Sequence, residues 1–300
     1  MAEKVTMQNL LDAGVHYGHQ TRRWNPKMKP YIFGARNGVY IFDLAVTMRQ
    51  LQSACEFLYD IVERGGDILF VGTKRQAQEC VRACAETTGM HFMCARWLGG
   101  TLTNNQTIRR SIDRMLGIQK MEVEGAINEM PKKEAASMRR ELYKLERNLN
   151  GIVNMRGMPK VMVVVDVVRE EIAVREASRL NIPIIGIVDS NCDPDNIDLV
   201  IPGNDDALRA IKIIIDTLAS SVTAARELYE RLAAEEKARK EQEKAEAQKK
   251  KQAAADSGKA TDSADSAEAS VPDAGDDTAD EQTKDAAAGA ESTKAELEKS

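Results

Sequence analysis

The pattern of apolar and polar residues is clearest between residues 158 and 189, where two apolar runs flank an amphipathic segment. Residues 161–165 form an unbroken, mostly β-branched run that is too short for an isolated helix, so it predicts a strand buried on both faces. Residues 169–180 follow helical spacing until Pro183 ends the helix, and 184–188 is a second apolar run. The helix residues predicted to lie on the apolar side are Ile172, Ala173, Ala177 and Leu180. The unit therefore predicts two parallel strands joined by a right-handed helical crossover.

The same alternation of apolar runs and helical spacing extends over most of the chain before residue 225. Helices are predicted over 44–62 and 207–218, and short strands over 67–71, 91–95 and 197–201. A buried parallel sheet needs helices on both of its faces, and these helices supply them. The predicted fold class is therefore α/β, a Rossmann-like (flavodoxin-like) parallel sheet flanked by helices.

Residues 104–150 interrupt this alternation with two stretches of helical spacing. Pro131 suits the first turn of the second stretch, and Gly151 ends it. The apolar residues that recur at intervals of three, four or seven are Ile108, Ile112, Met115, Met138, Leu142, Leu145 and Leu149. They predict an inserted antiparallel coiled-coil helical hairpin that projects from the sheet.

Composition divides the chain into four predicted parts. The α/β domain comprises residues 1–103 and 151–225 and includes a basic N-terminal hairpin segment, while the inserted hairpin occupies the gap. Residues 226–252 predict a solvated helical extension, and 253–300 a disordered acidic tail without aromatic residues. From residue 256 onward, 13 acidic residues and 4 lysines give a charge of −9; because the whole chain carries −5, the remainder carries +4. The folded part is therefore mildly basic.

The segment from Ala13 to Phe42 contains no Asp or Glu, although it holds five Lys or Arg residues and six aromatic residues or histidines before Tyr40. Cations interleaved with aromatic rings suit a polyanion that also offers flat faces for stacking, as RNA does. Apolar runs on both sides of Asn37-Gly38 predict a β-hairpin. An alternative is that the hairpin aromatics form a small core and the charges are solvated ends. The predicted RNA contacts here are Arg22, Arg23, Trp24, Lys27, Lys29 and Arg36.

A second acid-free stretch, from Phe92 to Ile112, contains the other of the two tryptophans. Its predicted RNA contacts, with one arginine just beyond it, are Arg96, Trp97, Asn104, Arg109, Arg110 and Arg114. The alternative for the helical arginines is an ordinary solvated helix face. Thr103 with Gln106 fits a helix capping box.

The residues Gly72-Thr73-Lys74-Arg75 follow a predicted strand, but neither GxxxxGK[ST] nor GxGxxG is present. Thr73 with Gln76 fits another capping box, which places Lys74 and Arg75 at a helix N-terminus. Because helix N-termini favour anions, both residues are predicted to contact an RNA phosphate.

A loop rich in carboxylates follows the strand 184–188, at the edge where open α/β sheets place ligands. Asp189 and Asp205, with His16, are predicted to hold a divalent ion, zinc or magnesium, although no cofactor is required. The alternative is that Asp205 lies in the first turn of a helix, where the dipole favours acids without a metal. The cysteines lack zinc-ribbon spacing, so we interpret Cys80, Cys84 and Cys94 as buried thiols rather than as a metal cluster with His91.

Catalytic signatures are missing from the chain. It has no phosphate-loop motif, no GxSxG elbow and only three histidines, so the prediction is a protein that is not an enzyme and has no small-molecule substrate. The first residues do not resemble a signal peptide, and no apolar run approaches the roughly 18 residues that span a bilayer. The predicted location is cytoplasmic, without a membrane partner.

Several long motifs follow one another along the chain: AGVHYGHQTRRWNPKMKPYIFGAR (13–36), LFVGTKR (69–75), RWLGGTLTN (96–104), residues 159–183, Asp193-Pro194 and VIPGNDDA (200–207). In this order they resemble bacterial small-subunit ribosomal protein two, the uS-two family. The resemblance covers roughly residues 5–225, and the family's shorter members lack the extension after about Arg226. The resemblance implies a Rossmann-like sheet with a coiled-coil hairpin, bound to 16S ribosomal RNA on the back of the 30S subunit. It also implies contacts with neighbouring 30S proteins, ribosomal protein one among them.

Three functions are therefore compared. The first is a structural RNA-binding component of the small ribosomal subunit, acting in translation. The second is a nucleotide-binding or enzymatic doubly wound domain, since that fold supports many functions. The third is a protein-binding scaffold that acts through the helical hairpin and the tail.

Overall fold

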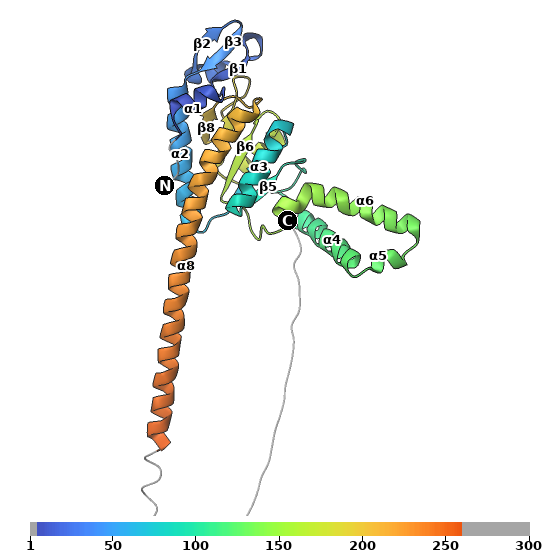
Figure 1. The fold of residues 1–300 in the computed structure, drawn as a ribbon, viewed down its shortest axis with the longest axis vertical. Helices are drawn as coiled ribbons and strands as arrows, with labels where there is room; N and C mark the ends of the chain where they lie inside the picture. Colours follow the sequence, from blue (N-terminus) through green and yellow to red (C-terminus); the bar gives the residue numbers. More distant parts are fainter. Residues whose placement is uncertain (1–4, 260–300) are drawn as a thin grey trace, which may run out of the picture. The chain divides into compact units, whose positions relative to one another are not determined.

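The structure is a computed structural model that describes residues 5–259 (Figure 1). Contacts along the chain divide it into two units, with the boundary between residues 240 and 241. The elements in chain order are α1 (Met7–Asp12), β1 (Tyr17–Gln20), η1 (Thr21–Arg23), η2 (Pro26–Tyr31), β2 (Ile32–Arg36), β3 (Val39–Phe42), α2 (Leu44–Glu63), β4 (Ile68–Val71), α3 (Arg75–Thr88), β5 (His91–Met93), α4 (Asn105–Val123), α5 (Ala126–Glu129), α6 (Lys132–Leu149), η3 (Asn150–Ile152), β6 (Val161–Val165), α7 (Glu171–Arg179), β7 (Ile184–Val188), β8 (Leu199–Pro202) and α8 (Leu208–Lys259).

The larger sheet has five strands in the order β5-β4-β6-β7-β8, and every neighbouring pair is parallel. Numbered along the chain, this is the 2-1-3-4-5 order of flavodoxin-like folds, whose order reverses between the first and third strands. The predicted α/β, flavodoxin-like class is confirmed. The reversal places the carboxyl ends of β4 and β6 side by side, which matters for the site below.

The central strands send alternate side chains into two separate cores. Val161, Val163 and Val165 of β6 pack with α2, α3 and α8, whereas Met162 and Val164 pack with α7 and the other face. All five residues of β6 and all five of β7 are buried. Both faces of these strands are covered, so every side chain along them must be apolar. This is why unbroken apolar runs predicted them.

The phase of α7 differs from the prediction. Ile172 and Leu180 are 55% and 39% exposed, while Val174 and Glu176 are buried in their place beside Ala173. In this orientation the carboxylate of Glu176 accepts hydrogen bonds from the loop of residues 97–103, a contact that apolar spacing does not reveal. The helix and its position in the chain were predicted correctly, but the predicted burial of Ile172 and Leu180 was wrong.

The inserted segment forms a helical hairpin, in which α4 packs beside α6 and α5 lies between them in the chain (Figure 1). Leu142 and Leu149 are buried as predicted, whereas Met138 and Leu145 are half-buried. The residues that α4 buries are Ile108, Ile112, Met115 and Ile118. The coiled-coil character of this pairing stays a prediction.

Helix α8 is one continuous element of 52 residues. It begins at Leu208, so Asp205 and Asp206 lie before the helix and not in its first turn as predicted. Along its exposed part, ion pairs join Arg226 to Glu230 and Glu236 to Lys240. The helix runs past residue 252, where the disordered tail was predicted to begin, and the rest of that predicted tail, residues 260–300, lies outside the described residues.

The root of the hairpin offers a test of this packing. A Cβ atom at Gly151 would lie 2.1 Å from the carbonyl oxygen of Phe92 and 2.6 Å from its ring, and a backbone atom cannot move away as a side chain can. We expect Gly151→Ala to lower the free energy of unfolding by roughly 3 kcal/mol, the upper end of typical overpacking costs. Denaturant unfolding measures it. Gly157→Ala is the matched control, because nothing lies within 4 Å of that position; equal effects of the two substitutions would contradict the packing described.

Candidate nucleic-acid interface

The predicted β-hairpin of the acid-free N-terminal segment is confirmed, and a third strand joins it. The strand order is β1-β3-β2, and both contacts are antiparallel. Asn37 and Gly38 turn the chain with φ values of 53° and 75°, the two left-handed residues that a tight type I′ hairpin turn needs. The small sheet thus gives the basic segment a fixed framework.

Most predicted contacts of this segment lie on its surface. Arg22, Arg23, Lys29 and Arg36 are exposed, and no carboxylate of residues 5–241 lies at ion-pair distance from any of the four. Trp24 is half-buried, with its ring 5.0 Å from that of Tyr40. The four cations are therefore available to a ligand.

The aromatic residues of the segment divide between the two alternatives left open above. Phe42 is buried and Tyr31 packs against the same core, as the small-core alternative expects. Phe33 is 79% exposed, so its ring is free for a partner. Both roles are present on one small sheet.

Lys27 has a partner inside the protein. Its ammonium group lies 2.8 Å from the carboxylate of Asp193 and also contacts Asp195, and these hydrogen bonds raise the pKa of Lys27. Its charge is therefore already compensated, so Lys27 joins the basic segment to the loop after β7 instead of standing free. These ion pairs give Lys27 a positioning role, and its predicted RNA contact stays a prediction.

Ser190, in the loop after β7, also binds the N-terminal basic segment, through backbone N–H groups of that segment. Its hydroxyl accepts a hydrogen bond from the His19 backbone N–H (2.8 Å), and its carbonyl accepts one from the Asn25 N–H (2.8 Å). A Cβ at Gly18 would lie 2.9 Å from the Ser190 hydroxyl, so the approach needs glycine there. These contacts fix the segment against the carboxyl edge of the large sheet.

That edge carries a cluster of carboxylates around Lys74. The ammonium group lies 2.7 Å from Asp205, 2.6 Å from Asp206 and 3.3 Å from Asp166. Burial lowers the pKa of Lys74, but hydrogen bonds to Asp205 and Asp206 outweigh it and raise the pKa above its ordinary value. Lys74 itself is buried, so the predicted phosphate contact is wrong for this residue, whereas Arg75 beside it is exposed.

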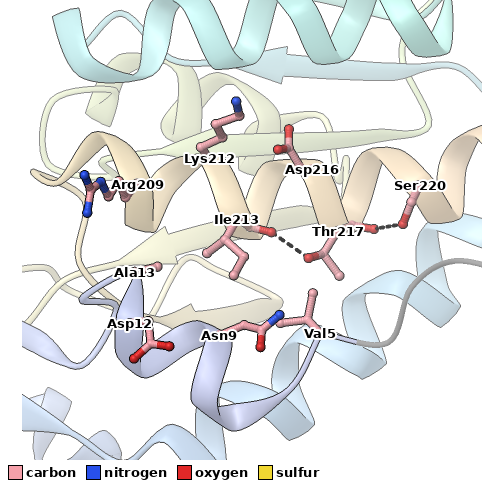
Figure 2. Close-up of a pocket in the computed structure, with 10 residues that line it drawn as sticks. All are labelled: Val5, Asn9, Asp12, Ala13, Arg209, Lys212, Ile213, Asp216, Thr217 and Ser220. Carbon is pink, nitrogen blue, oxygen red and sulfur yellow. Dashed lines mark hydrogen bonds between the residues drawn. The ribbon is translucent and has the colours of Figure 1, made fainter.

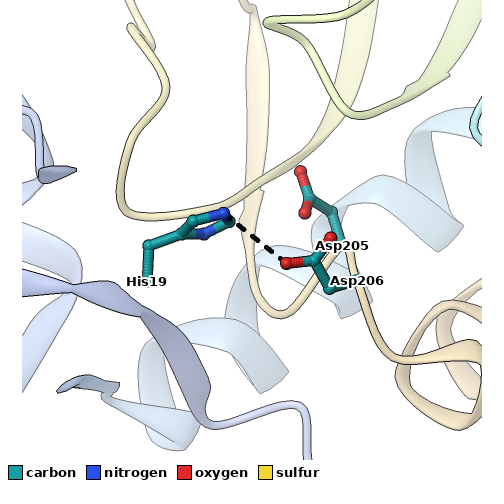
Figure 3. Close-up of side chains that lie close together, drawn as sticks. All are labelled: His19, Asp205 and Asp206. Atoms are coloured by element: carbon teal, nitrogen blue, oxygen red, sulfur yellow. Dashed lines mark ion pairs between the residues drawn. The ribbon is translucent and has the colours of Figure 1, made fainter.

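His19, and not His16, reaches this cluster (Figure 3). Its Nδ1 lies 3.0 Å from Asp189 and its Nε2 3.5 Å from Asp206, and the hydrogen bond to Asp189 raises the pKa of His19. The donor atoms of His19, Asp205 and Asp206 lie within 4.8 Å of one another. The histidine of the predicted metal set is therefore corrected, because strand β1 turns His19 toward the acids.

His16 lies in a different environment. Its ring centroid is 4.0 Å from that of Tyr17, and burial lowers the pKa of His16.

Burial also raises the pKa of Asp205, to about 7, with the charges of Asp166 and Asp189 adding to the effect. Burial and the neighbouring acids together thus outweigh the hydrogen bond and charge of Lys74, which act to lower the pKa of Asp205.

The crevice where a doubly wound sheet would bind a phosphate is filled by protein side chains. Glu170, 2% exposed, accepts hydrogen bonds from the Thr73 backbone N–H (2.9 Å) and from the Thr73 hydroxyl, and Arg169 donates to that hydroxyl (3.0 Å). Lys74 and not Thr73 precedes the first turn of α3, and no side chain caps it. The predicted capping box is wrong, and an N–H group that a phosphate would take is already bound to a carboxylate.

The second acid-free stretch is organised by Glu176. Its carboxylate accepts hydrogen bonds from Trp97 Nε1 (3.0 Å) and from the backbone N–H groups of Gly100 (2.7 Å), Leu102 (3.0 Å) and Thr103 (3.2 Å). Burial alone would raise the pKa of Glu176, but these bonds hold it below its ordinary value. Trp97 is 7% exposed, so the predicted stacking residue belongs to the interior.

The hydroxyl of Thr103 also donates to Glu176 (3.2 Å), and Asn104, without a side-chain cap, precedes the first turn of α4. The second predicted capping box is therefore wrong for the same reason as the first. In both cases a threonine that suits a cap binds a buried glutamate.

The remaining predicted contacts lie on or near α4. Arg96, Asn104 and Arg110 are exposed. Arg109 is half-buried and donates to the Val153 carbonyl (3.4 Å), while Arg114 is paired with Glu141 across the hairpin. The arginines of α4 thus serve partly as internal contacts.

Sequence reasoning missed Glu170, Glu176 and Ser190. Of the three, Glu176 alone had a sequence signal of burial. It lies between Val174 and Ala177, on the apolar face of its helix. Cys80, Cys84 and Cys94 are buried, as was interpreted, and burial raises the pKa of Cys84 and Cys94 to about 12.

A separate hollow of about 810 Å³ lies between α1 and α8 (Figure 2). Asp12, Arg209, Lys212 and Asp216 line it, so its charges are mixed. None of the predicted site residues contributes to it. No helix among the described residues has the length and apolar character needed to cross a bilayer.

A comparison with protein families settles the class of the chain. The model of the family described as ribosomal protein S2 matches residues 10–225. The chain belongs to the ribosomal protein S2 family, whose members are structural proteins of the small ribosomal subunit and not enzymes. The resemblance drawn from the motifs is confirmed. Membership places the chain in a ribonucleoprotein that acts in translation, with ribosomal RNA and ribosomal proteins as its partners, in the cytoplasm.

The glutamate that holds the second stretch can be tested directly. Glu176→Gln replaces an oxygen that accepts hydrogen bonds with an NH₂ group that donates, so buried donors lose their partner, and we expect unfolding to become easier by about 3 kcal/mol. Because the folded pKa of Glu176 is lowered, its contribution is present above the unfolded pKa, near 4.3, and is lost as pH falls through the folded value. The difference from the unsubstituted chain should therefore shrink below about pH 4.

Denaturant unfolding across this pH range measures the difference. The control is Glu171→Gln on the same helix, whose exposed ion pair with Arg175 contributes less than about 1 kcal/mol. A Glu176→Gln variant as stable as this control would show that the loop does not depend on the carboxylate.

Proposed function

We propose that the chain is a structural component of the small ribosomal subunit that binds 16S ribosomal RNA through its N-terminal basic segment. The observation that carries this proposal is the set of exposed cations without a carboxylate partner on that segment, at Arg22, Arg23, Lys29 and Arg36. Phosphate contacts supply most of the affinity for nucleic acids, and unpaired surface cations supply those contacts. Arg75, Arg96 and Arg110 add exposed charge elsewhere.

The segment also offers rings beside its charges. Phe33 is exposed, and Trp24 lies half-buried next to Tyr40. Unstacked RNA bases are held on such faces. The backbone ties to Ser190 and the ion pairs of Lys27 support this function by holding cations and rings in one fixed arrangement.

The nucleotide-binding alternative is less well supported, because Glu170 and Lys74 fill the crevice at the strand-order reversal. For protein partners, we propose contacts with neighbouring 30S proteins, ribosomal protein one among them. The support is the family resemblance. Crosslinking of assembled 30S subunits, followed by identification of the linked chains, tests this, and subunits in which ribosomal protein one never links to this chain would contradict it.

Replacing Arg22, Arg23, Lys29 and Arg36 together with Ala should weaken binding to a 16S ribosomal RNA transcript. Each lost phosphate contact should also reduce the slope of log affinity against log salt by about 0.7–0.9, hence by roughly 3 for all four. Filter binding at several salt concentrations measures both quantities.

The matched control replaces four other exposed cations, Arg49, Arg64, Arg175 and Arg179, with Ala, so that the net charge changes equally. The control should keep most of the affinity and the slope. If both variants lose them equally, the effect is one of overall charge and the segment is not the binding site.

We also propose a divalent ion, zinc or magnesium, among His19, Asp189, Asp205 and Asp206. Four carboxylates, with Asp166, meet only Lys74 and His19, and Asp205 already has its pKa raised to about 7. Carboxylate oxygens with one imidazole form a reasonable ligand set, and a cation would relieve their repulsion.

Calorimetric titration with Zn²⁺ and with Mg²⁺ tests this site. We expect one ion per chain, with affinity at least about tenfold weaker in His19→Ala because a direct ligand is lost, whereas His16→Ala should bind as the unsubstituted chain does. Equal binding by the two variants, or loss in His16→Ala alone, would refute the assignment.

A further inference from the structure

The outer side of α6 carries a row of cations without an acid. At 100° per residue, an arc of roughly 120° contains five Lys or Arg residues, one tyrosine and one alanine. All of them are exposed, Tyr143 by 66%. The residues of this arc, called here the α6 face, are Lys132, Lys133, Ala136, Arg140, Tyr143, Lys144 and Arg147.

Two of the acids of α6 bind residues of α4 instead. Glu141 pairs with Arg114 of α4, and Glu146 accepts a hydrogen bond from Gln119 (2.7 Å). The cation of α6 that lies outside the face, Arg139, is paired with Glu122 and with Asn128. Carboxylates thus hold the two helices together, while the cations of the α6 face are left over.

Among residues 5–241, whose side chains the structure describes, no carboxylate lies at ion-pair distance from any of the five cations of the α6 face. Within the same range, the head-group hydrogen bond of this set is that of Arg140 Nε with the Ala136 carbonyl on its own helix (3.1 Å). Lys132 to Arg147 spans about 22 Å at 1.5 Å per residue. The α6 face therefore holds its unpaired positive charges at fixed positions on a helix, unlike a flexible basic tail.

We propose that the α6 face is a second RNA-binding surface, which holds the phosphate backbone of a structured RNA along the length of the helix. This inference rests on the proposed function and deepens it, because it assigns an RNA partner to the hairpin. A regular row of phosphates matches a regular row of cations, and a positive helix face without acids has little charge complementarity to a protein surface of mixed sign.

Tyr143 sits between the cations of this face. Its exposed ring can stack on an unpaired base or lie against a sugar, contacts that RNA offers and that a purely electrostatic partner does not use. The sequence prediction placed the hairpin's contacts on α4, at Arg109, Arg110 and Arg114. The structure moves the main surface to α6, since two of those three arginines have internal partners.

The test replaces Lys132, Lys133, Arg140, Lys144 and Arg147 with Ala in the full chain. Alanine favours helix, so the hairpin should keep its fold, which circular dichroism and denaturant unfolding confirm. Affinity for a 16S ribosomal RNA transcript should fall at least about tenfold, and the salt slope by roughly 3–4. A second variant, Tyr143→Leu, should weaken binding without changing the slope, and Tyr143→Phe should restore it.

The matched control removes five exposed cations on or next to other helices, at Arg49, Arg64, Arg82, Arg175 and Arg179, and should bind nearly as the unsubstituted chain does. A face variant that binds RNA like this control overturns the inference. If the basic-segment variant still loses affinity in that experiment, the proposed function stands; if neither variant loses it, both fail.

A third result separates the classes of partner. A face variant that binds the RNA transcript normally but is left out of assembled 30S subunits would show that the face contacts a protein, and the inference of an RNA partner would be wrong. Loss of both RNA affinity and assembly is the expected outcome.

Discussion

The ion pairs of Lys74 are the interaction around which the carboxyl edge of the sheet is built. One ammonium group meets acids from the end of β6 and from the loop before α8, and Asp206 of that loop also contacts His19 of the N-terminal segment. Bringing these backbones together places several carboxylates at short range, which is unfavourable unless a cation lies among them. Lys74 satisfies that constraint, so its charge is a requirement of the fold. The N-terminal segment, which bears the exposed arginines, contacts the same cluster through His19.

A flavodoxin-like sheet supplies a crevice at its strand-order reversal, and many proteins use it for a cofactor or substrate. Here protein groups occupy that crevice: Glu170 binds the Thr73 backbone, and Lys74 lies among aspartates. A structural network takes the place of a ligand there, and exposed cations lie on outer surfaces instead, on the N-terminal segment with its small β1-β3-β2 sheet and on α6. The fold acts as a scaffold on which two charged surfaces are presented.

Much of the fold could be predicted from the sequence because its signals are local. The apolar runs of β6 and β7 and the Asn37-Gly38 turn each depend on neighbouring residues. The uses of single polar side chains could not be predicted, because they depend on distant partners. Thr73 and Thr103 suit helix caps as well as they suit a buried glutamate, and nothing near them in the sequence points to Glu170 or Glu176. His16 and His19 are equally plausible ligands until strand β1 orients them. The α6 face was missed because Glu134, Glu141 and Glu146 are interspersed in the sequence and leave the row only when the helix is formed.

The contacts of Ser190 have a consequence for the order in which the chain is made. The hydroxyl that holds the His19 backbone is 171 residues further along the chain, and the carbonyl that holds Asn25 belongs to the same residue. At about 5–20 residues per second, synthesis of this interval takes roughly 10–30 s. Throughout that time the basic segment lacks these contacts, because neither Ser190 nor the acids that pair with Lys27 have been synthesised. The surface that is translated first can thus pair its own three strands early, but it is fixed against the large sheet only after residue 190 has been made.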